Sequence, residues 1–164
     1  MESEIRAASF APKIAWDIVE RRKHKLHTTI CGSLGTGDMP SIDTRALPAI
    51  DSLQVELRGL FSGNVNVGRL YLRAYPECRN GENLFKLIQR ALGRKETDLY
   101  VVGLYNLTDH LDAGEAHDLG ALVQRWWDRP LLRMQIDHLW LMGAKDDLVL
   151  ESRVVQKVLL GGRA

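Results

Sequence analysis

The sequence predicts an α+β fold of mostly antiparallel strands, with helices covering the outer faces of the sheets. Three observations predict this class. Short stretches of alternating apolar and polar residues, which are typical of strands, recur along the chain. Stretches with helical spacing interrupt them, so the expected order of elements is α, β, ββ, α, β, α, ββ. The 164 residues are 45% hydrophobic and 26% charged, which suits a single domain over residues 1–164.

The sequence of the N-terminal part of the chain predicts a short helix over residues 13–23. Pro12 precedes residues 13–23, and proline is common in the first turn of a helix. Residues 21–25 are all basic and fall at the C-terminal end of this helix, where positive charge suits the helix dipole. The basic cluster is either a solvated helix end or a rim that attracts phosphate.

A strand and a loop are expected next. Residues 25–31 are rich in β-branched side chains and predict a short strand, whose alternation places His27 and Thr29 on one face. Residues 32–41 contain three glycines. These glycines lack the spacing of a dinucleotide fingerprint, and no Lys-Ser/Thr ending of a phosphate loop follows them, so the segment predicts a mobile loop.

Two alternating stretches, 53–61 and 68–75, predict a β-hairpin because a turn-like segment joins them. One face of this hairpin is apolar, and the opposite face carries Arg69, Tyr71 and Arg73. Guanidinium groups bind phosphate through paired donors, and tyrosine rings stack on bases, so the polar face predicts a substrate-binding surface. The alternative is a solvated sheet face.

The rest of the chain predicts two helices and three strands. Apolar residues at helical spacing indicate the helices, and the second helix has the spacing of a capping box at its start. The expected elements are a helix over 82–92, a strand over 99–108, a helix from Asp112 to Trp127, and strands over 131–142 and 147–155 joined by a tight turn.

Two residue pairs with the same spacing carry the candidate chemistry. His27 and Thr29 lie on the first strand, and Asn106 and Thr108 lie on the later one. Imidazole exchanges protons near neutral pH, and a threonine hydroxyl donates to phosphate oxygen. If the two pairs face each other, they define two pseudo-symmetric lobes around a central cleft. The alternative for His27 is a half-exposed strand histidine without a catalytic role.

These motifs resemble a known family. The run KLHTTICGSLG, the hairpin, the helix, the run YNLTDHLDAGEAHDLGALVQRW and the closing strands are similar to the two-histidine (2H) phosphoesterases. That superfamily includes RNA ligase-like proteins of 2′-5′ specificity and cyclic phosphodiesterases. The resemblance covers roughly residues 25 to 160 and implies a two-lobed fold around a cleft, with a nucleotide or an RNA terminus as the partner.

The resemblance also implies roles for the two pairs. The family signature is two copies of His-x-Thr/Ser, in which one histidine acts as base and the other as acid while water attacks a cyclic phosphate. His27 and Thr29 match the first copy, whereas Asn106 replaces the second histidine and Thr108 keeps the hydroxyl. Asparagine cannot exchange protons at neutral pH, so the resemblance implies phosphate binding more securely than turnover. His110 substitutes for the missing histidine if the strand continues to it.

The net charge, the histidines and cysteines, and the lack of long apolar segments limit the partners, cofactors and location that we expect. The chain has 22 basic and 21 acidic residues, so only a local basic patch can attract a polyanion. His117 and His138 show no metal-ligand spacing, and Cys31 and Cys78 are too few for a disulfide framework or a cysteine-built metal site, so no metal and no cofactor are expected. Without an apolar signal core or a membrane helix, we expect a cytoplasmic protein that binds no membrane.

Three hypotheses about function follow. The first is a metal-independent phosphodiesterase that acts on a cyclic phosphate or an RNA-end phosphodiester, with impaired catalysis where Asn106 stands. The second is a catalytically silent module of the same fold that binds a nucleotide or RNA. The third is a protein-interaction domain whose paired tryptophans, Trp126 and Trp127, mark a partner surface.

Overall fold

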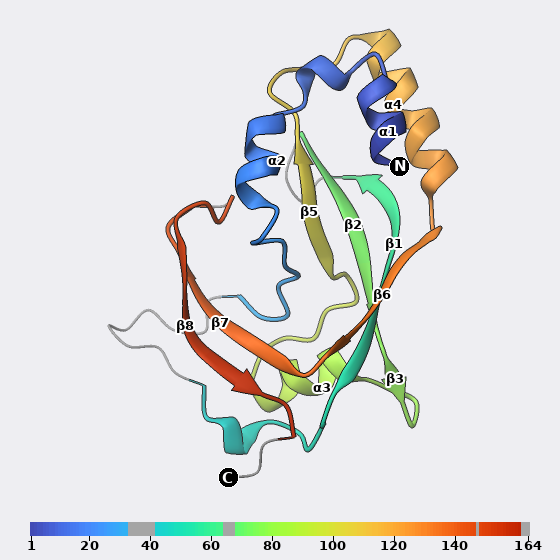
Figure 1. The fold of residues 1–164 in the computed structure, drawn as a ribbon. Helices are drawn as coiled ribbons and strands as arrows, with labels where there is room; N and C mark the ends of the chain where they lie inside the picture. Colours follow the sequence, from blue (N-terminus) through green and yellow to red (C-terminus); the bar gives the residue numbers. More distant parts are fainter. Residues whose placement is uncertain (33–41, 64–67, 147, 162–164) are drawn as a thin grey trace. The chain divides into compact units, whose positions relative to one another are not determined.

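The structure is a computed structural model that describes residues 1–32, 42–63, 68–146 and 148–161. It is an α+β fold with four α-helices among these residues. In chain order the elements are α1 (Glu2–Ala7), η1 (Ala11–Lys13), α2 (Trp16–Arg22), η2 (Thr44–Ala46), β1 (Leu53–Ser62), β2 (Arg69–Pro76), β3 (Cys78–Arg79), β4 (Glu82–Asn83), α3 (Leu84–Ala91), β5 (Val101–Asn106), α4 (Ala113–Trp126), β6 (Pro130–Ile136), β7 (His138–Ala144) and β8 (Ser152–Leu159) (Figure 1).

The strands form one four-stranded sheet in the order β5-β2-β1-β6 and two two-stranded sheets, β3-β4 and β7-β8. The pairs β2/β5, β3/β4 and β7/β8 are antiparallel. The predicted α+β class with mostly antiparallel strands is therefore confirmed. None of the helices in the described ranges is long and apolar enough to span a bilayer.

The chain divides into two compact units, which are described separately. Unit 1 consists of Met1–Thr28, Leu57–Ala74 and Val101–Leu132, and unit 2 of Thr29–Glu56, Tyr75–Tyr100 and Arg133–Ala164. Strands β1, β2 and β6 contribute residues to both units. All predicted site residues except Thr29 belong to unit 1.

Unit 1 has an apolar core to which its helices and strands contribute. Its fully buried side chains include Ile5, Phe10, Leu60 and Leu70. Helices α1 and α4 lie side by side in Figure 1. Glu4 joins them, because its carboxylate accepts hydrogen bonds from Arg125 at 2.6 Å and from the Trp126 indole at 3.1 Å.

The start of α4 confirms the predicted capping box. The Asp112 side chain accepts a hydrogen bond from the Glu115 backbone N–H at 2.9 Å, and the Glu115 side chain accepts one from the Asp112 N–H at 2.8 Å. These two bonds satisfy backbone donors that have no partner within the helix. Lys13 Nζ also donates to the Glu115 carboxylate at 2.5 Å, which attaches this end of α4 to η1.

Unit 2 has its own core, and Gln89 of α3 is a buried polar residue in it. The Gln89 amide donates to the Ile30 carbonyl and to the Thr97 hydroxyl, and its oxygen accepts from the Thr97 N–H and the Tyr100 hydroxyl. These four hydrogen bonds satisfy the donors and the acceptor of the amide. Gln89 therefore orders the loop between α3 and β5 without leaving a buried polar group unpaired. Asn83 caps α3 by accepting from the backbone N–H of Phe85 and of Lys86.

Several predicted elements are confirmed, within one or two residues at most ends. The stretches 53–61 and 68–75 are the neighbouring strands β1 and β2, 82–92 contains α3, and 99–108 contains β5. The last two strands pair with each other as expected. The tight turn predicted between them is wrong, because β7 runs to Ala144 and β8 begins only at Ser152, later than the predicted start at 147. The predicted mobile loop falls largely on residues 33–41, and part of the turn between β1 and β2 on 64–67, both outside the described residues.

Three further predictions of local structure are wrong. Residues 25–31 form no strand, because their one ladder contact is an isolated bridge from Thr28 to Val102. The stretch 131–142 is two strands, β6 and β7, separated at Asp137. The helix predicted over 13–23 is α2, which covers only Trp16–Arg22, and the N-terminal helix α1 was not expected.

Candidate functional site

His27 is half-buried, and its ring contacts the backbone two residues earlier in the chain. Its Nδ1 lies 2.8 Å from the carbonyl oxygen of Lys25. A carbonyl oxygen only accepts, so this contact assigns the proton to Nδ1. In the neutral ring, Nε2 then keeps its lone pair, as a general base requires.

The backbone next to His27 touches the outer edge of β5 at one isolated bridge. Thr28 forms an antiparallel bridge with Val102, which places His27 next to Gly103 along the edge. Directly opposed residues of a ladder share a face, and neighbours along a strand alternate. The bridge places Thr28 on the face of β5 that carries Val102, and the alternation of a ladder, extended by one residue from this bridge, assigns His27 to the face that carries Gly103.

Two arginines meet over Gly103. Arg22, at the end of α2, has an exposed fraction of 4% and donates from Nη2 to the Gly103 carbonyl oxygen at 3.2 Å. A Cβ placed on Gly103 would lie 3.2 Å from Cδ of Arg69 and 3.6 Å from Nη2 of Arg22. The missing side chain at Gly103 thus leaves room for two cationic side chains, from α2 and β2, at one point of the sheet.

Asn106 lies directly opposite Arg69 in the β2/β5 register. Its side-chain oxygen Oδ1 is buried and accepts no hydrogen bond within the described residues. Buried acceptors without a partner are rare in folded proteins, and they indicate a place where a donor from water or a ligand fits. Asn106, Arg69, Arg22, Gly103 and His27 together are called the Gly103 cluster below.

Thr108 is committed to another contact. Its backbone N–H and its hydroxyl both donate to the carbonyl oxygen of Lys13, at 2.8 Å and 3.2 Å. A hydroxyl has one proton, so in this arrangement Thr108 has none left to donate to a phosphate. Thr29 is exposed and belongs to unit 2, and its predicted contact with phosphate stays a prediction.

The polar face predicted for the hairpin is only partly polar. Tyr71 has an exposed fraction of 2%, and its ring packs against Phe61 with centroids 5.4 Å apart. The expectation that Tyr71 stacks on a base is therefore wrong, because a buried ring has no free face. Arg73 is half-buried opposite Val101, so it lies on the same face of the sheet as Arg69.

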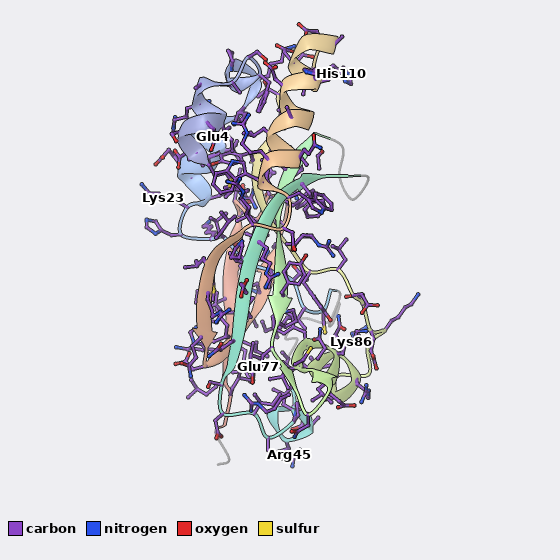
Figure 2. The ribbon with its side chains drawn as sticks, turned by 90° about the vertical axis from the view of Figure 1, so that its right-hand side faces the viewer. Glu4, Lys23, Arg45, Glu77, Lys86 and His110 are labelled. Carbon is purple, nitrogen blue, oxygen red and sulfur yellow. The ribbon has the colours of Figure 1, made fainter. Side chains whose placement is uncertain are left out.

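His110 does not continue the strand. β5 ends at Asn106, and His110 is exposed next to the start of α4 (Figure 2). Its backbone N–H donates to the Asp109 carboxylate at 2.7 Å, and its carbonyl accepts from Lys13 at 2.7 Å. The condition for its role as a substitute acid, a strand that reaches it, is not met. His117 is exposed on α4.

Arg22 and Gly103 are the residues of this cluster that sequence analysis missed, and Arg22 is the one with a functional side chain. It belongs to the basic run 21–25, whose alternatives were a solvated helix end and a phosphate-attracting rim. A signal was present, because Arg22 follows Ile18 by four residues, the spacing that places two side chains on one face of a helix. Ile18 is half-buried and Arg22 is buried, so this face of α2 points inward.

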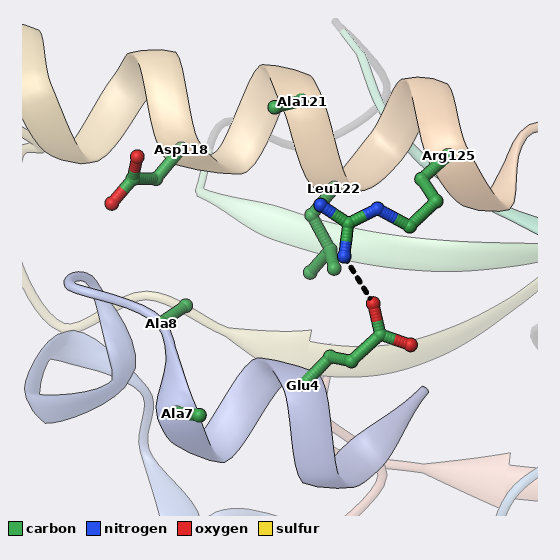
Figure 3. A pocket seen from close by; sticks show the side chains of 7 residues that line it. All are labelled: Glu4, Ala7, Ala8, Asp118, Ala121, Leu122 and Arg125. Carbon is green, nitrogen blue, oxygen red and sulfur yellow. Dashed lines mark hydrogen bonds and ion pairs between the residues drawn. The ribbon is translucent and has the colours of Figure 1, made fainter.

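A shallow pocket of about 280 Å³ lies elsewhere in unit 1, between α1 and α4 (Figure 3). Its lining includes Ala7, Ala8 and Ala121, and its charged side chains already have partners. Glu4 pairs with Arg125, and Asp118 accepts a hydrogen bond from Ser9. The pocket therefore offers little polar chemistry. Among the residues that the structure describes, no three His, Cys, Asp or Glu side chains gather closely enough to hold a metal ion.

Comparisons with protein-family models, with curated proteins and with solved structures give no match for this chain. The candidate function therefore depends on the geometry of the Gly103 cluster.

Proposed function

We propose that the Gly103 cluster binds the phosphodiester of a nucleotide or RNA end and that the chain is a metal-independent phosphodiesterase with slow turnover. The observation that carries this proposal is the meeting of Arg22 and Arg69 over Gly103. Two guanidinium groups close together favour an anion between or beside them, and their planar donors match phosphate oxygens. Both side chains also have further interactions within the chain.

In this proposal His27 acts as the general base and Asn106 accepts a hydrogen bond from the substrate or from water. Nε2 of His27 takes a proton from water as the water oxygen attacks the phosphorus atom. The new P–O bond forms while the P–O bond to the 2′ or 3′ oxygen breaks, which opens a cyclic phosphate to a monoester. Asn106 holds a substrate hydroxyl or a water molecule through its free Oδ1. The two-lobed cleft that the resemblance implies is part of this proposal.

The rate of this reaction is limited at the leaving oxygen. That oxygen needs a proton as the bond breaks, and the Asn106 amide has none to give at neutral pH. Water must then supply the proton, and the lost general acid costs roughly 10²–10⁴-fold in rate. The silent binding module is the same proposal with turnover below detection.

The experiment uses nucleoside 2′,3′-cyclic phosphates with the whole chain in a chelator. Calorimetry measures affinity, and chromatography detects the monophosphate. We expect binding that weakens at least about tenfold in Arg69→Gln, and turnover that His27→Ala abolishes. Lys23→Gln is the control for the loss of one positive charge. Lys23 is an exposed residue of the basic run 21–25 and pairs with Glu20, so its loss should leave binding and turnover unchanged.

Asn106→His separates the enzyme from the binding module. If the cluster has the geometry of an acid–base pair, this variant gains turnover over the wild-type chain. Binding without turnover in both proteins supports the module. No binding of any cyclic nucleotide at millimolar concentration contradicts both forms of the proposal.

A protein-interaction role is the second candidate, and one observation favours it. Trp127, after the end of α4, has an exposed fraction of 55%. Large exposed aromatic side chains are enriched at protein interfaces. If Trp127 mediates self-association, sedimentation velocity shows a concentration-dependent mass that Trp127→Ala removes, with nucleotide affinity unchanged.

A further inference from the structure

The two-stranded sheet β7-β8 in unit 2 has one buried face and one face open to solvent. Leu141 and Val158 lie on the buried face, with exposed fractions of 6% and 1%. The open face is defined by four directly opposed pairs: His138 with Leu159, Trp140 with Lys157, Met142 with Val154, and Ala144 with Ser152. These eight residues are called the Trp140 face.

An exposed aromatic pair occupies one half of this face. Trp140 has an exposed fraction of 48%, and the His138 ring lies beside it with centroids 5.7 Å apart and planes inclined by 39°. The next apolar neighbours, Val154 and Leu159, are also exposed. An indole and an imidazole standing on a sheet surface offer flat faces on which bases stack.

The charges on this face have one sign. Lys157 stands directly opposite Trp140 and is exposed, and no member of the Trp140 face is acidic. A carboxylate next to this face belongs to Asp137, which precedes β7 and contacts Nδ1 of His138. Lys157 also interacts electrostatically with Asp137 and lowers its pKa, after the larger effect of the His138 hydrogen bond.

We propose that the Trp140 face binds single-stranded nucleic acid, with bases stacked on Trp140 and His138 and a backbone phosphate at Lys157. Exposed apolar area alone would fit a second copy of the chain equally well. The cation directly opposite the indole and the absence of carboxylates from the face favour a polyanion with flat aromatic groups. This inference does not depend on the proposed function, because all its residues belong to unit 2.

The test is fluorescence anisotropy of the whole chain with a labelled single-stranded RNA of about ten nucleotides, a length typical for such sites. Trp140→Ala should weaken binding by about 5-fold to 100-fold, which is the range for loss of one stacked base. Trp140→Phe should restore most of the affinity. Trp127→Ala, which removes a tryptophan of similar exposure from unit 1, should leave it unchanged.

Charge variants sharpen the test. Lys157→Gln should weaken binding and flatten its dependence on salt, because one phosphate contact is lost. Asp137→Asn removes the negative charge that interacts with His138 and Lys157, so it should tighten RNA binding, whereas a basic partner peptide would bind this variant more weakly. Trp140 is exposed, so unfolding curves of Trp140→Ala should match those of the wild-type chain.

Three outcomes would overturn the proposal. The first is no RNA binding at low salt. The second is binding that survives Trp140→Ala but is lost in Arg69→Gln, which would assign it to the Gly103 cluster. The third is a wild-type dimer that Trp140→Ala dissociates, which would assign the face to a second copy of the chain. Cyclic-nucleotide affinity of Trp140→Ala separately reports on the proposed function.

Discussion

Arg22 Nη2 donates a hydrogen bond to the carbonyl oxygen of Gly103 across 3.2 Å, and this bond joins the end of α2 to β5. Figure 1 shows α2 lying beside β5. The bond places a buried positive charge against the strand that carries Asn106. We therefore expect Arg22 to affect two properties that can be measured separately, the stability of the chain and the proposed binding of an anion.

Arg22→Met keeps much of the apolar length of the side chain and removes the guanidinium group. We expect a loss of about 1.5–3 kcal/mol in the free energy of unfolding, since a buried hydrogen bond from a charged group is broken. Affinity for a 2′,3′-cyclic nucleotide should fall at least about tenfold. Urea unfolding and calorimetry measure the two effects. Equal stability of the variant and the wild-type chain would contradict the structural role of Arg22.

Gly103→Ala tests the space that the two arginines share. The added methyl group would lie 3.2 Å from Cδ of Arg69, so Arg69 must move away from β5. We expect a several-fold loss of cyclic-nucleotide affinity and a destabilisation of about 1 kcal/mol. Gly120→Ala is the matched control. It lies in α4 with nothing within 4 Å of an added Cβ, and it should stabilise the chain by about 0.5–1 kcal/mol.

The capping box predicts the response of α4 to a single substitution. Asp112→Ala removes the acceptor for the Glu115 N–H, so the free energy of unfolding should fall by about 1 kcal/mol. Asp112→Asn keeps a side-chain oxygen at this position and should retain most of the stability. Equal urea midpoints for Asp112→Ala and the wild-type chain would show that α4 starts without this cap in solution.

Tyr105 predicts a pH dependence in the alkaline range. Burial raises the pKa of its phenol from 10 to about 12. The neutral phenol is favoured in the folded chain, so its contribution to stability is complete below pH 10 and is lost as the pH rises from 10 towards 12. The wild-type chain should lose about 1.4 kcal/mol per pH unit in that range beyond the loss seen in Tyr105→Phe. Parallel urea curves for the two proteins at high pH would contradict this pKa.

The elements that could be predicted from the sequence are those specified by local chemistry. Asp112 and Glu115 have the spacing of a capping box, and α4 begins there. The alternation of residues 53–61 and 68–75 predicts β1 and β2 because each strand buries alternate side chains over part of its length. Periodicity carries this information without reference to distant parts of the chain.

The features that could not be predicted depend on which segments meet. The alternating pattern of residues 131–142 runs on through Asp137, although β6 belongs to the four-stranded sheet and β7 pairs with β8. Tyr71 alternates with the apolar residues of β2, yet packing against Phe61 buries its ring. At residues 25–31, β-branched composition favours a strand, but only Thr28 makes a ladder contact. The β-propensity of single residues predicts strands poorly where tertiary contacts determine which segments pair.

The candidate site also combines residues that could be predicted from the sequence with residues whose roles depend on distant contacts. His27 and Asn106 were predicted from their spacing, and both lie along β5, one beside it and one at its end. Arg22 was hidden in a run of five basic residues, because only the fold distinguishes the buried member from the solvated ones. The Thr108 hydroxyl was predicted to hold phosphate, but it donates to the Lys13 carbonyl, a contact made over a long separation in sequence.

The most direct test of the central claim is a titration of the ¹⁵N-labelled chain with a nucleoside 2′,3′-cyclic phosphate in a chelator, followed by nuclear magnetic resonance. We predict that the largest shifts occur at the amides of Gly103 and Asn106 and at the ring nitrogens of His27, and that Arg69→Gln abolishes them. Shifts confined to other residues, or none at millimolar ligand, would contradict the phosphodiester site.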